Sequence, residues 1–185
     1  MMPATEEALW RNARRWLVLG SSGSGKTTLA KRLAATCDLP VIHMDSEFWH
    51  PGWVQPEKAA WASRVRGLVE ADEWVMDGNY SSTLPVRLER ADVAILLDIP
   101  VSLCLWSVYR RSLSGLGQVR PDLPEGCPEQ LPDREFLHYI LSYKRRSRPK
   151  VLRLVGESDV PLIRLRSRRE ADAFLSRVES TVARG

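Results

Sequence analysis

One glycine-rich segment, residues 20–27, constrains the fold of this chain more than any other. It reads Gly-Ser-Ser-Gly-Ser-Gly-Lys-Thr and satisfies G-x-x-x-x-G-K-[ST], the Walker A pattern of phosphate-binding loops. An apolar run of strand length, residues 16–19, precedes it, and Leu29 and Leu33 follow at helical spacing. This order lets backbone N–H groups and the positive end of a helix dipole face one phosphate chain. The segment therefore predicts a nucleoside triphosphate site.

Within this segment, Lys26 is expected to reach the β- and γ-phosphates, and the Thr27 hydroxyl can ligate Mg²⁺. The alternative is a Gly/Ser-rich turn that happens to precede a helix, and the correct flanks on both sides argue against it. ATP and Mg²⁺ are the cofactors that this reading predicts. The predicted phosphate-binding residues are Gly20, Ser21, Ser22, Gly23, Ser24, Gly25, Lys26, Thr27 and Thr28.

Apolar runs alternate with helical patterns along the rest of the chain. This alternation predicts a single α/β domain over residues 1–185, with a parallel sheet between two layers of helices. Such sheets bind ligands beyond the carboxyl ends of their strands, and Gly20, Asp45, Asp77 and Asp98 all fall at such ends. Strands are expected at residues 16–19, 41–44, 74–76, 93–97 and 161–165, and helices at 28–34, 56–69, 84–89, 101–113, 133–148 and after 167. The apolar stretch at residues 151–155 is expected to extend the helical region beyond residue 148.

Residues 114–132 form a long stretch without hydrophobic periodicity, and they include three glycines and four prolines. A loop of this length inside a compact domain is usually functional. Several arginines lie in or around it, and arginine forks match phosphate oxygens bidentately. We therefore predict a lid over the nucleotide, although a solvated basic helix face is the alternative for any one arginine. The arginines assigned to this role are Arg110, Arg111, Arg120, Arg145 and Arg148.

Composition favours a cytoplasmic protein that does not contact a membrane. Hydrophobic residues make up 44% of the chain, enough for a substantial core, yet no apolar run approaches membrane-spanning length. Residues 1–15 have no apolar signal-peptide core. Cys37, Cys104 and Cys127 are odd in number and far apart, which argues for reduced thiols and against a disulfide or zinc framework.

Charge is distributed unevenly between the two halves of the chain. Of the 27 Lys+Arg and 23 Asp+Glu residues, 16 and 10 respectively lie from Val101 onward, so the C-terminal half is basic. A basic half suits a site that closes over a polyanion such as ATP. Nucleic-acid binding would use the same charge, so the asymmetry does not distinguish the two.

Several motifs together resemble the adenylate-kinase-like P-loop kinases: Asp77-Gly78 after the third expected strand, Asp98-Ile99-Pro100 after the fourth, and Arg110-Arg111 before the lid. A narrower resemblance is to a bacterial group often labelled "DNA topology modulation protein" or "adenylate kinase and related kinases". The segments that carry it are residues 41–49, 51–53, 74–80, 120–122 and 165–167, and the likeness extends from about residue 16 to residue 174. It implies a three-layer P-loop NTPase fold with strand order 2-3-1-4-5.

The resemblance also implies roles for particular residues. The strand order would place Asp77 beside Thr27, where a Walker-B-like carboxylate holds Mg²⁺. Arg166 and Ser167 would fall in the loop that holds the nucleotide base, with Ser167 also able to cap the last helix. For Asp98, a capping role and a catalytic role remain equally open.

The acceptor side departs from adenylate kinase, which has an arginine four residues after the aspartate of its Asp-Gly pair. Here that position is Ser81, and Arg87 is the nearest arginine, so a phosphate-bearing acceptor is in doubt. P-loop kinases that act on hydroxyls also have a carboxylate at the end of strand two, and Asp45 could orient or deprotonate such a hydroxyl. The predicted acceptor-binding residues are Asp45, Phe48, Trp49, Trp53, Asp77, Tyr80 and Arg87.

The predicted catalytic residues are Lys26, Asp45, Arg110 and Arg111, and the predicted Mg²⁺ ligands are Thr27 and Asp77. The aromatic residues near Asp45 could instead be satellite core packing. His43 and His50 flank Asp45, but a packed, hydrogen-bonded histidine is a better reading of His43 than a metal ligand.

These features predict an ATP-dependent kinase that transfers a phosphoryl group to a small-molecule hydroxyl or to a nucleotide. The alternative is a nucleotide-binding regulatory protein that affects DNA topology. The chain has no helix-turn-helix signature, zinc module or long basic tail, and the basic cluster at residues 145–150 is the one patch in favour of DNA binding. A plain NTPase is less favoured, because a lid over an aromatic pocket serves to exclude water.

Overall fold

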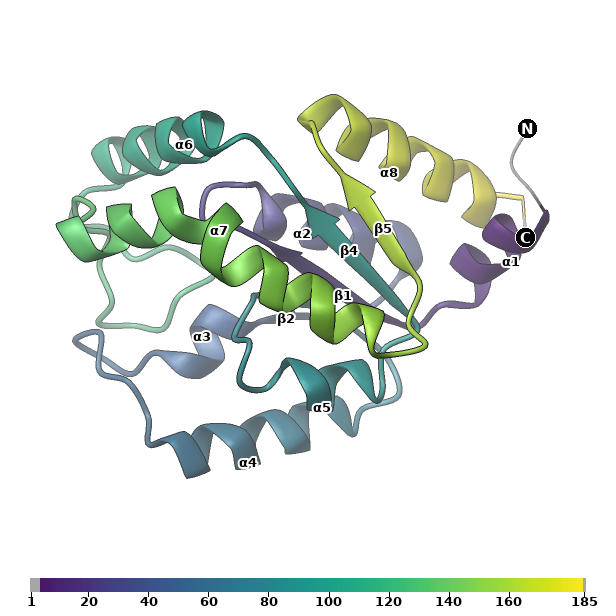
Figure 1. The fold of residues 1–185 in the computed structure, drawn as a ribbon, viewed down its shortest axis with the longest axis horizontal. Coiled ribbons are helices and arrows are strands. Elements are labelled where there is room, and N and C mark those ends of the chain that lie inside the picture. Colours follow the sequence, from purple (N-terminus) through teal and green to yellow (C-terminus); the bar gives the residue numbers. More distant parts are fainter. Residues whose placement is uncertain (1–3, 185) are drawn as a thin grey trace.

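Five parallel strands form one sheet in the order β2-β3-β1-β4-β5 in the computed structural model, which describes residues 4–184 (Figure 1). The strand order predicted from the sequence is confirmed, and this topology with its phosphate-binding loop is the P-loop NTPase fold. The strands are β1 (Arg15–Gly20), β2 (Val41–His43), β3 (Trp74–Asp77), β4 (Val93–Leu97) and β5 (Leu162–Leu165).

Helices cover both faces of the sheet. Because successive strand residues point to opposite sides, each strand contributes side chains to two separate hydrophobic clusters. Trp16 and Val18 of β1 pack into one cluster, and Leu17 and Leu19 pack into the other. The first cluster lies under α1 (Ala4–Asn12), α2 (Lys26–Cys37), α6 (Val101–Ser114) and α8 (Arg168–Val182). The second lies under α3 (Met44–Phe48), α4 (Lys58–Val69), α5 (Leu84–Leu88) and the C-terminal part of α7 (Arg134–Gly156).

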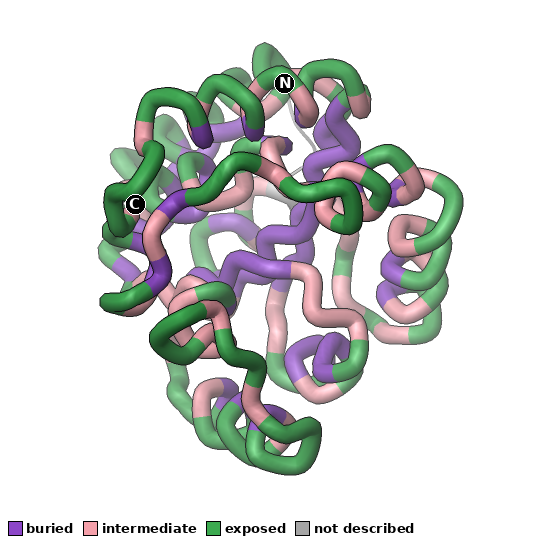
Figure 2. Tube along the Cα trace, turned by 90° about the vertical axis from the view of Figure 1, so that its left-hand side faces the viewer, coloured by how far each residue is buried: buried purple, intermediate pink, exposed green. Residues whose placement is uncertain are grey.

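The strands form the centre of the molecule, and the outer faces of the helices are exposed (Figure 2). All four residues of β3 and all five of β4 are buried. Strands covered on both faces read as continuous apolar runs, which is why their positions were predictable from the sequence. Cys37, Cys104 and Cys127 carry free thiols. In the described part of the chain, no helix has both the length and the apolar character needed to span a bilayer.

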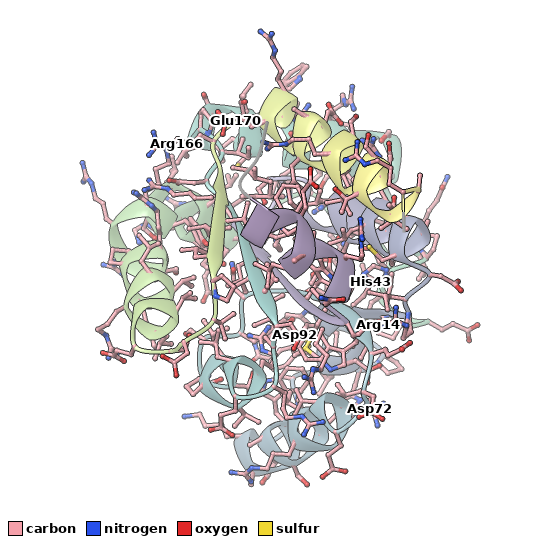
Figure 3. All side chains as sticks on the ribbon, turned by 90° about the vertical axis from the view of Figure 1, so that its right-hand side faces the viewer. Arg14, His43, Asp72, Asp92, Arg166 and Glu170 are labelled. Carbon is pink, nitrogen blue, oxygen red and sulfur yellow. The ribbon has the colours of Figure 1, made fainter. Side chains whose placement is uncertain are left out.

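The start of β1 is anchored by a carboxylate from a distant part of the chain. Asp92 accepts hydrogen bonds from the backbone N–H groups of Arg14 and Arg15, each at 2.9 Å, and from the Arg15 guanidinium at 2.9 Å (Figure 3). Burial opposes ionisation of this carboxyl, but the Arg15 side chain and the two backbone donors together lower the pKa of Asp92. The contact sets the position of β1 relative to β4 and so helps to place the phosphate-binding loop at the opposite end of the strand.

Two elements differ from the sequence prediction. The second strand ends at His43, and Met44 begins the short helix α3 where a loop was expected. Five residues are too few to show helical periodicity, which explains why α3 was missed. Helix α7 runs without interruption to Gly156 although Pro149 lies inside it, so the stretch at residues 151–155, expected to extend the helical region, is part of the same helix. A proline removes one backbone donor from a helix, which is why the helix itself was expected to end at about residue 148.

Candidate active site

The phosphate-binding loop joins β1 to α2 and is held in shape by glycines with positive φ. Gly23 has φ 76°, and a Cβ there would lie 2.2 Å from the Cys104 carbonyl oxygen of α6. Gly25 is the N-cap of α2 with φ 97°, a left-handed conformation that side-chain-bearing residues rarely adopt. The loop therefore requires glycine at both positions, and it leaves the N-terminus of α2 facing the cavity described below.

The Lys26 ammonium and the Ser24 hydroxyl are two polar side-chain groups of this loop that could meet a phosphate. Lys26 Nζ donates to the Ser21 carbonyl oxygen at 3.0 Å, which closes the loop over its own centre. Burial lowers the pKa of Lys26, and the nearby Asp45 and Asp77 carboxylates oppose that shift. The Ser24 hydroxyl is buried and has no hydrogen-bond partner within residues 4–184. An unpaired buried hydroxyl and an ammonium beside it suit a phosphate oxygen.

Asp77 lies beside Thr27, as the sequence reading expected. The Thr27 hydroxyl donates to Asp77 Oδ2 at 2.8 Å, and Asp77 is only 6% exposed. Mg²⁺ usually keeps several waters and takes one or two protein oxygens plus the phosphates of its nucleotide. No cluster of three or more His, Cys, Asp or Glu side chains suited to a metal occurs in the described region. Thr27 and Asp77 fit Mg²⁺ brought in with ATP.

The other oxygen of Asp77 is held by His43. These two residues are paired in the register of β2 and β3, and His43 Nδ1 donates to Asp77 Oδ1 at 2.8 Å. His43 is thus the hydrogen-bonded histidine that the sequence favoured over a metal ligand. Its partner was not predictable, because the pairing depends on the register of two strands. The carboxylate is held between His43 and Thr27 and has little freedom to rotate.

Asn79 was given no role in the sequence reading, yet it joins three parts of the site. Its side-chain amide exchanges two hydrogen bonds with the Gly20 backbone: Gly20 N donates to Oδ1 at 3.0 Å, and Nδ2 donates to Gly20 O at 2.6 Å. Nδ2 also donates to the Tyr139 hydroxyl of α7 at 3.1 Å. Asn79 therefore fixes the first glycine of the phosphate-binding loop to the segment after β3 and to α7.

Arg87 was predicted to bind the acceptor, and that prediction is wrong. Its side chain is fully buried on α5 and donates to three backbone carbonyls, those of Gly78 at 2.7 Å, Tyr80 at 3.1 Å and Asn79. Burial lowers the pKa of Arg87 to about 9, which leaves it protonated at neutral pH. The guanidinium supports the turn after β3 from the core side and is out of reach of a ligand.

Replacing Arg87 with methionine should destabilise the fold by about 2–4 kcal/mol, because it leaves three buried carbonyl oxygens without their donor. Urea unfolding followed by circular dichroism measures this change. Arg90→Met is the matched control: Arg90 lies in the next turn, is exposed, and pairs with Asp72 only at 3.9 Å, so about 0.5 kcal/mol or less is expected. Equal unfolding midpoints for the two variants would contradict the supporting role of Arg87.

Asp45 lies in the first turn of α3 with an aromatic group around it. The Tyr80 hydroxyl donates to Asp45 Oδ1 at 2.7 Å, and burial together with this carboxylate raises the pKa of Tyr80. Trp49 and Trp53 meet edge to face with ring centroids 5.4 Å apart, and both line the cavity. Phe48, which was expected to line it too, packs instead behind Tyr80 at a centroid distance of 4.7 Å. Phe48 was a loop residue in the sequence reading, but it ends α3 and faces the core.

One cavity of about 1280 Å³ connects the phosphate-binding loop with this aromatic group. Single-ligand pockets are typically about 300–1,000 Å³, so the space accommodates a nucleotide and a second molecule. The predicted site residues that line it are Ser22, Gly23, Ser24, Gly25, Lys26, Thr27, Thr28, Asp45, Trp49, Trp53, Asp77, Tyr80, Arg110, Arg111 and Arg120. Those that do not are Gly20, Ser21, Phe48, Arg87, Arg145, Arg148, Arg166 and Ser167.

The segment between α6 and α7, residues 115–133, contributes to the lining of this cavity and contains most of the stretch for which a lid was predicted, residues 114–132. Arg120 of this segment and Arg111 at the end of α6 are held by carboxylates that were not singled out in the sequence. Glu129, 5% exposed, accepts from Arg111 Nε at 3.2 Å and pairs with Arg120 Nε at 2.7 Å. Arg120 also donates to Asp122 at 2.8 Å. Glu129 and Asp122 therefore set the positions of the two guanidinium groups.

The lid also contacts the loop at residues 49–54 that carries the tryptophans. Gly52 N donates to the Gly126 carbonyl oxygen at 2.8 Å, and Trp53 Nε1 donates to the Pro128 carbonyl oxygen at 3.2 Å. The Cys127 thiol lies 3.2 Å from the His50 carbonyl oxygen. The two segments are thus joined by hydrogen bonds into one wall of the cavity.

Arg145 and Arg148 do not belong to the lid. Arg145 is exposed on α7 outside the cavity, and Arg148 Nε lies 3.2 Å from Asp98 Oδ2. Asp98 is also paired with Arg164 of β5, and the N-cap of α6 is Pro100, which has no side-chain cap. Asp98 therefore neither caps α6 nor reaches the cavity; it holds β5 and α7 against the end of β4.

The predicted base-binding pair, Arg166 and Ser167, begins α8 instead. Ser167 is the N-cap, and its Oγ accepts from Glu170 N at 3.1 Å, while Arg166 N donates to Glu170 Oε2 at 2.8 Å (Figure 3). The helix-capping role expected for Ser167 is confirmed. Arg168, in the first turn of α8, lines the cavity, and its guanidinium donates to the Ser107 hydroxyl of α6.

Solved structures share this fold across nearly their whole length. Shikimate kinase from Acinetobacter baumannii in complex with shikimate has a TM-score of 0.57 and 19% identity, and the match covers 94% of this chain and 97% of that chain. For a gluconokinase from Sinorhizobium meliloti 1021 the TM-score is 0.53, the identity is 15%, and 92% of each chain is covered. A sugar kinase from Janibacter sp. HTCC2649 has a TM-score of 0.52 and 19% identity, with 92% and 94% covered.

No protein-family model and no curated protein matches the chain. The narrower likeness to the "DNA topology modulation protein" group therefore rests on the quoted residues alone. At identities of 14–19%, the solved structures establish the fold. The chain has a P-loop NTPase fold of the kind found in shikimate kinase and gluconokinase.

Proposed function

We propose that this protein is an ATP-dependent kinase that transfers the γ-phosphoryl group to a hydroxyl of a small molecule. The observation that carries the proposal is the single cavity that joins Lys26, Thr27 and Asp77 at one end to Asp45 at the other. Phosphoryl transfer requires a donor and an acceptor held in one water-excluding space. The fold neighbours, named as shikimate kinase, gluconokinase and sugar kinase, support a small-molecule acceptor.

On the donor side the loop N–H groups and Lys26 neutralise charge on the β- and γ-phosphates. Mg²⁺ near Thr27 and Asp77 would supply further charge neutralisation when ATP is bound. The cavity is also lined by three arginines of α6 and the lid, Arg110, Arg111 and Arg120. Their guanidinium groups can donate hydrogen bonds to the oxygens of the transferred phosphoryl group as negative charge develops there. Because Arg111 and Arg120 are already oriented by Glu129, little side-chain entropy is lost when their guanidinium groups bind a phosphate.

On the acceptor side Asp45 is the group that can hydrogen-bond the attacking hydroxyl. One of its oxygens accepts from Tyr80, and the hydroxyl can donate to the other. A carboxylate in this position orients the oxygen for in-line attack and can take its proton. The rings of Trp49 and Trp53 would pack against the flat faces of the acceptor.

The alternative of a DNA-binding regulatory protein has less support. Its basic patch was the cluster at residues 145–150, and within this stretch Arg148 is engaged by Asp98. Lys144, next to it, lies 3.9 Å from the same carboxylate. A plain NTPase would not need the aromatic wall that the lid closes over.

The test is a screen of nucleosides, sugars, polyols and other hydroxylated metabolites for ADP release with MgATP, with Lys26→Ala as the blank. We expect one class of acceptor to raise ADP release well above that blank. Tight ATP binding with no acceptor active above the blank would contradict the kinase proposal and favour a regulatory role.

A further inference from the structure

The charged groups that line the cavity are distributed unevenly along it. Every cation among the lining residues comes from α2, α6, the lid or α8, which are the elements around the phosphate-binding loop. They are Lys26, Lys31, Arg32, Arg110, Arg111, Arg120 and Arg168. This end of the cavity, called the donor half here, matches the negative charge of a triphosphate.

The other end is built by two segments, residues 45–55 and 78–81, and is called the acceptor half. Among the described residues that line it there is one carboxylate, Asp45, and no cation; Asp77 lies at the boundary, hydrogen-bonded to Thr27 of the donor half. The remaining lining residues are neutral: Trp49, Trp53, Gln55, Gly78, Asn79, Tyr80 and Ser81. A bound group in the acceptor half therefore meets negative charge, hydrogen-bonding side chains and aromatic faces.

Arg87, Arg111 and Arg120 each have partners within the protein. Arg87 is fully buried, with its guanidinium donating to the carbonyls of residues 78–80. Arg111 and Arg120 share the buried Glu129, and Arg120 has a second carboxylate partner in Asp122. Asp133 and Glu135 add further negative charge to the lid side of the cavity. An acceptor carboxylate or phosphate bound among the described residues of the acceptor half would lose its hydration without gaining a cationic partner from that half.

Accepting the proposed kinase function, we infer that the acceptor is an electrically neutral, polyhydroxylated ring compound such as a sugar, a cyclic polyol or a nucleoside. A neutral ring avoids repulsion by Asp45, packs its faces on Trp49 and Trp53, and offers hydroxyls to Gln55 and Ser81. The same arrangement disfavours acids such as shikimate and gluconate, and nucleoside monophosphates. The acceptor class then differs in charge from those that two of the fold neighbours' names indicate.

Pairs of a neutral compound and its anionic counterpart test this inference. The pairs are adenosine with AMP, glucose with glucuronate, and shikimate methyl ester with shikimate, each assayed with the wild-type protein, MgATP and constant ionic strength. For a pair that reacts, kcat/KM for the neutral member should exceed that for the anion by at least about tenfold, since an unpaired anion near a carboxylate costs more than one hydrogen bond. The identity of the reacting pair separates nucleoside from sugar or polyol. Equal or better use of the anion overturns the inference.

Binding measured without turnover separates this inference from the kinase proposal. Calorimetry with the same pairs, in the presence of a non-hydrolysable ATP analogue, should show tighter binding of the neutral members. Preferential binding of the neutral members without any phosphoryl transfer would remove the kinase function and leave the charge preference standing. Preferential binding of the anions would overturn the charge preference whether or not turnover occurs.

A substitution that adds a cation to the acceptor half provides the converse test. Ser81 lines the cavity, whereas the adjacent Ser82 is exposed and does not. Ser81→Arg should shift the ratio of kcat/KM, or of affinity, by about tenfold towards the anionic member of each pair. Ser82→Arg adds the same charge outside the cavity and should leave the ratio unchanged. An unchanged ratio in Ser81→Arg, with a wild-type circular dichroism spectrum, counts against the charge explanation.

Discussion

Replacing Lys26 with alanine should lower kcat for phosphoryl transfer by about 10²–10³, the effect typical of losing one preorganised charge from a transition state. The ammonium is held at the centre of the phosphate-binding loop by the Ser21 carbonyl, so its position does not depend on the acceptor. ATP affinity should fall as well, because the same group meets the β- and γ-phosphates before transfer. Coupled detection of ADP gives kcat, and titration with MgATP gives the affinity.

The Lys26→Ala protein should remain folded. Burial disfavours the charged ammonium, so its removal does not cost stability through lost solvation, and it removes no core contact. Lys58→Ala, at the exposed start of α4, is the matched control and should leave both kcat and ATP affinity unchanged. More than a tenth of wild-type activity in Lys26→Ala would show that another cation of the donor half carries the charge.

Asp45→Asn should lower kcat by about 10²–10⁴, the usual contribution of a positioned general base, while leaving ATP affinity at the wild-type value. The substitution keeps the size of the side chain, and its Oδ1 can still accept from Tyr80, so the aromatic group around it should stay in place. Initial rates with a reacting acceptor and calorimetric titration with MgATP measure the two quantities.

Glu47→Gln tests whether any change of charge on α3 has the same effect. Glu47 lies two residues further along this helix and pairs with Arg64 at 2.6 Å outside the cavity. Its replacement should leave kcat unchanged. Similar losses in the two variants would assign the effect to the stability of α3, and full activity in Asp45→Asn would remove Asp45 from the reaction.

Lys26 belongs to the donor half of the cavity and Asp45 to the acceptor half, and the two halves differ in how far the sequence predicted them. The donor half was predictable from the sequence because one contiguous segment specifies it: the loop glycines, Lys26 and Thr27 are adjacent in the chain. The buried strands were predictable for a similar reason, since β3 and β4 are continuous apolar runs. Asp77 could be placed beside Thr27 only through a family's strand order, and the structure bears that placement out.

The acceptor half was less predictable because its side chains are selected by short elements and by turns. Helix α3 has five residues, too few to reveal which of its side chains face the core, so Phe48 was placed on the wrong side. Arg87 was chosen by its distance along the chain from Asp77, but its position on α5 points it inward. Asn79 and Glu129 have no pattern of their own: each gains its role from partners 59 and 18 residues away, Gly20 and Arg111.

The hydrogen bonds between the lid and residues 49–54 have a consequence for how the two substrates come and go. Gly52 and Trp53 donate hydrogen bonds to the backbone at Gly126 and Pro128, so the segment at residues 115–133 is joined to the segment that carries Trp49 and Trp53. Movement of residues 115–133 away from the cavity must therefore either break these two hydrogen bonds or carry residues 49–54 along. In the proposed kinase, release of ADP and release of the phosphorylated product would then depend on the same movement.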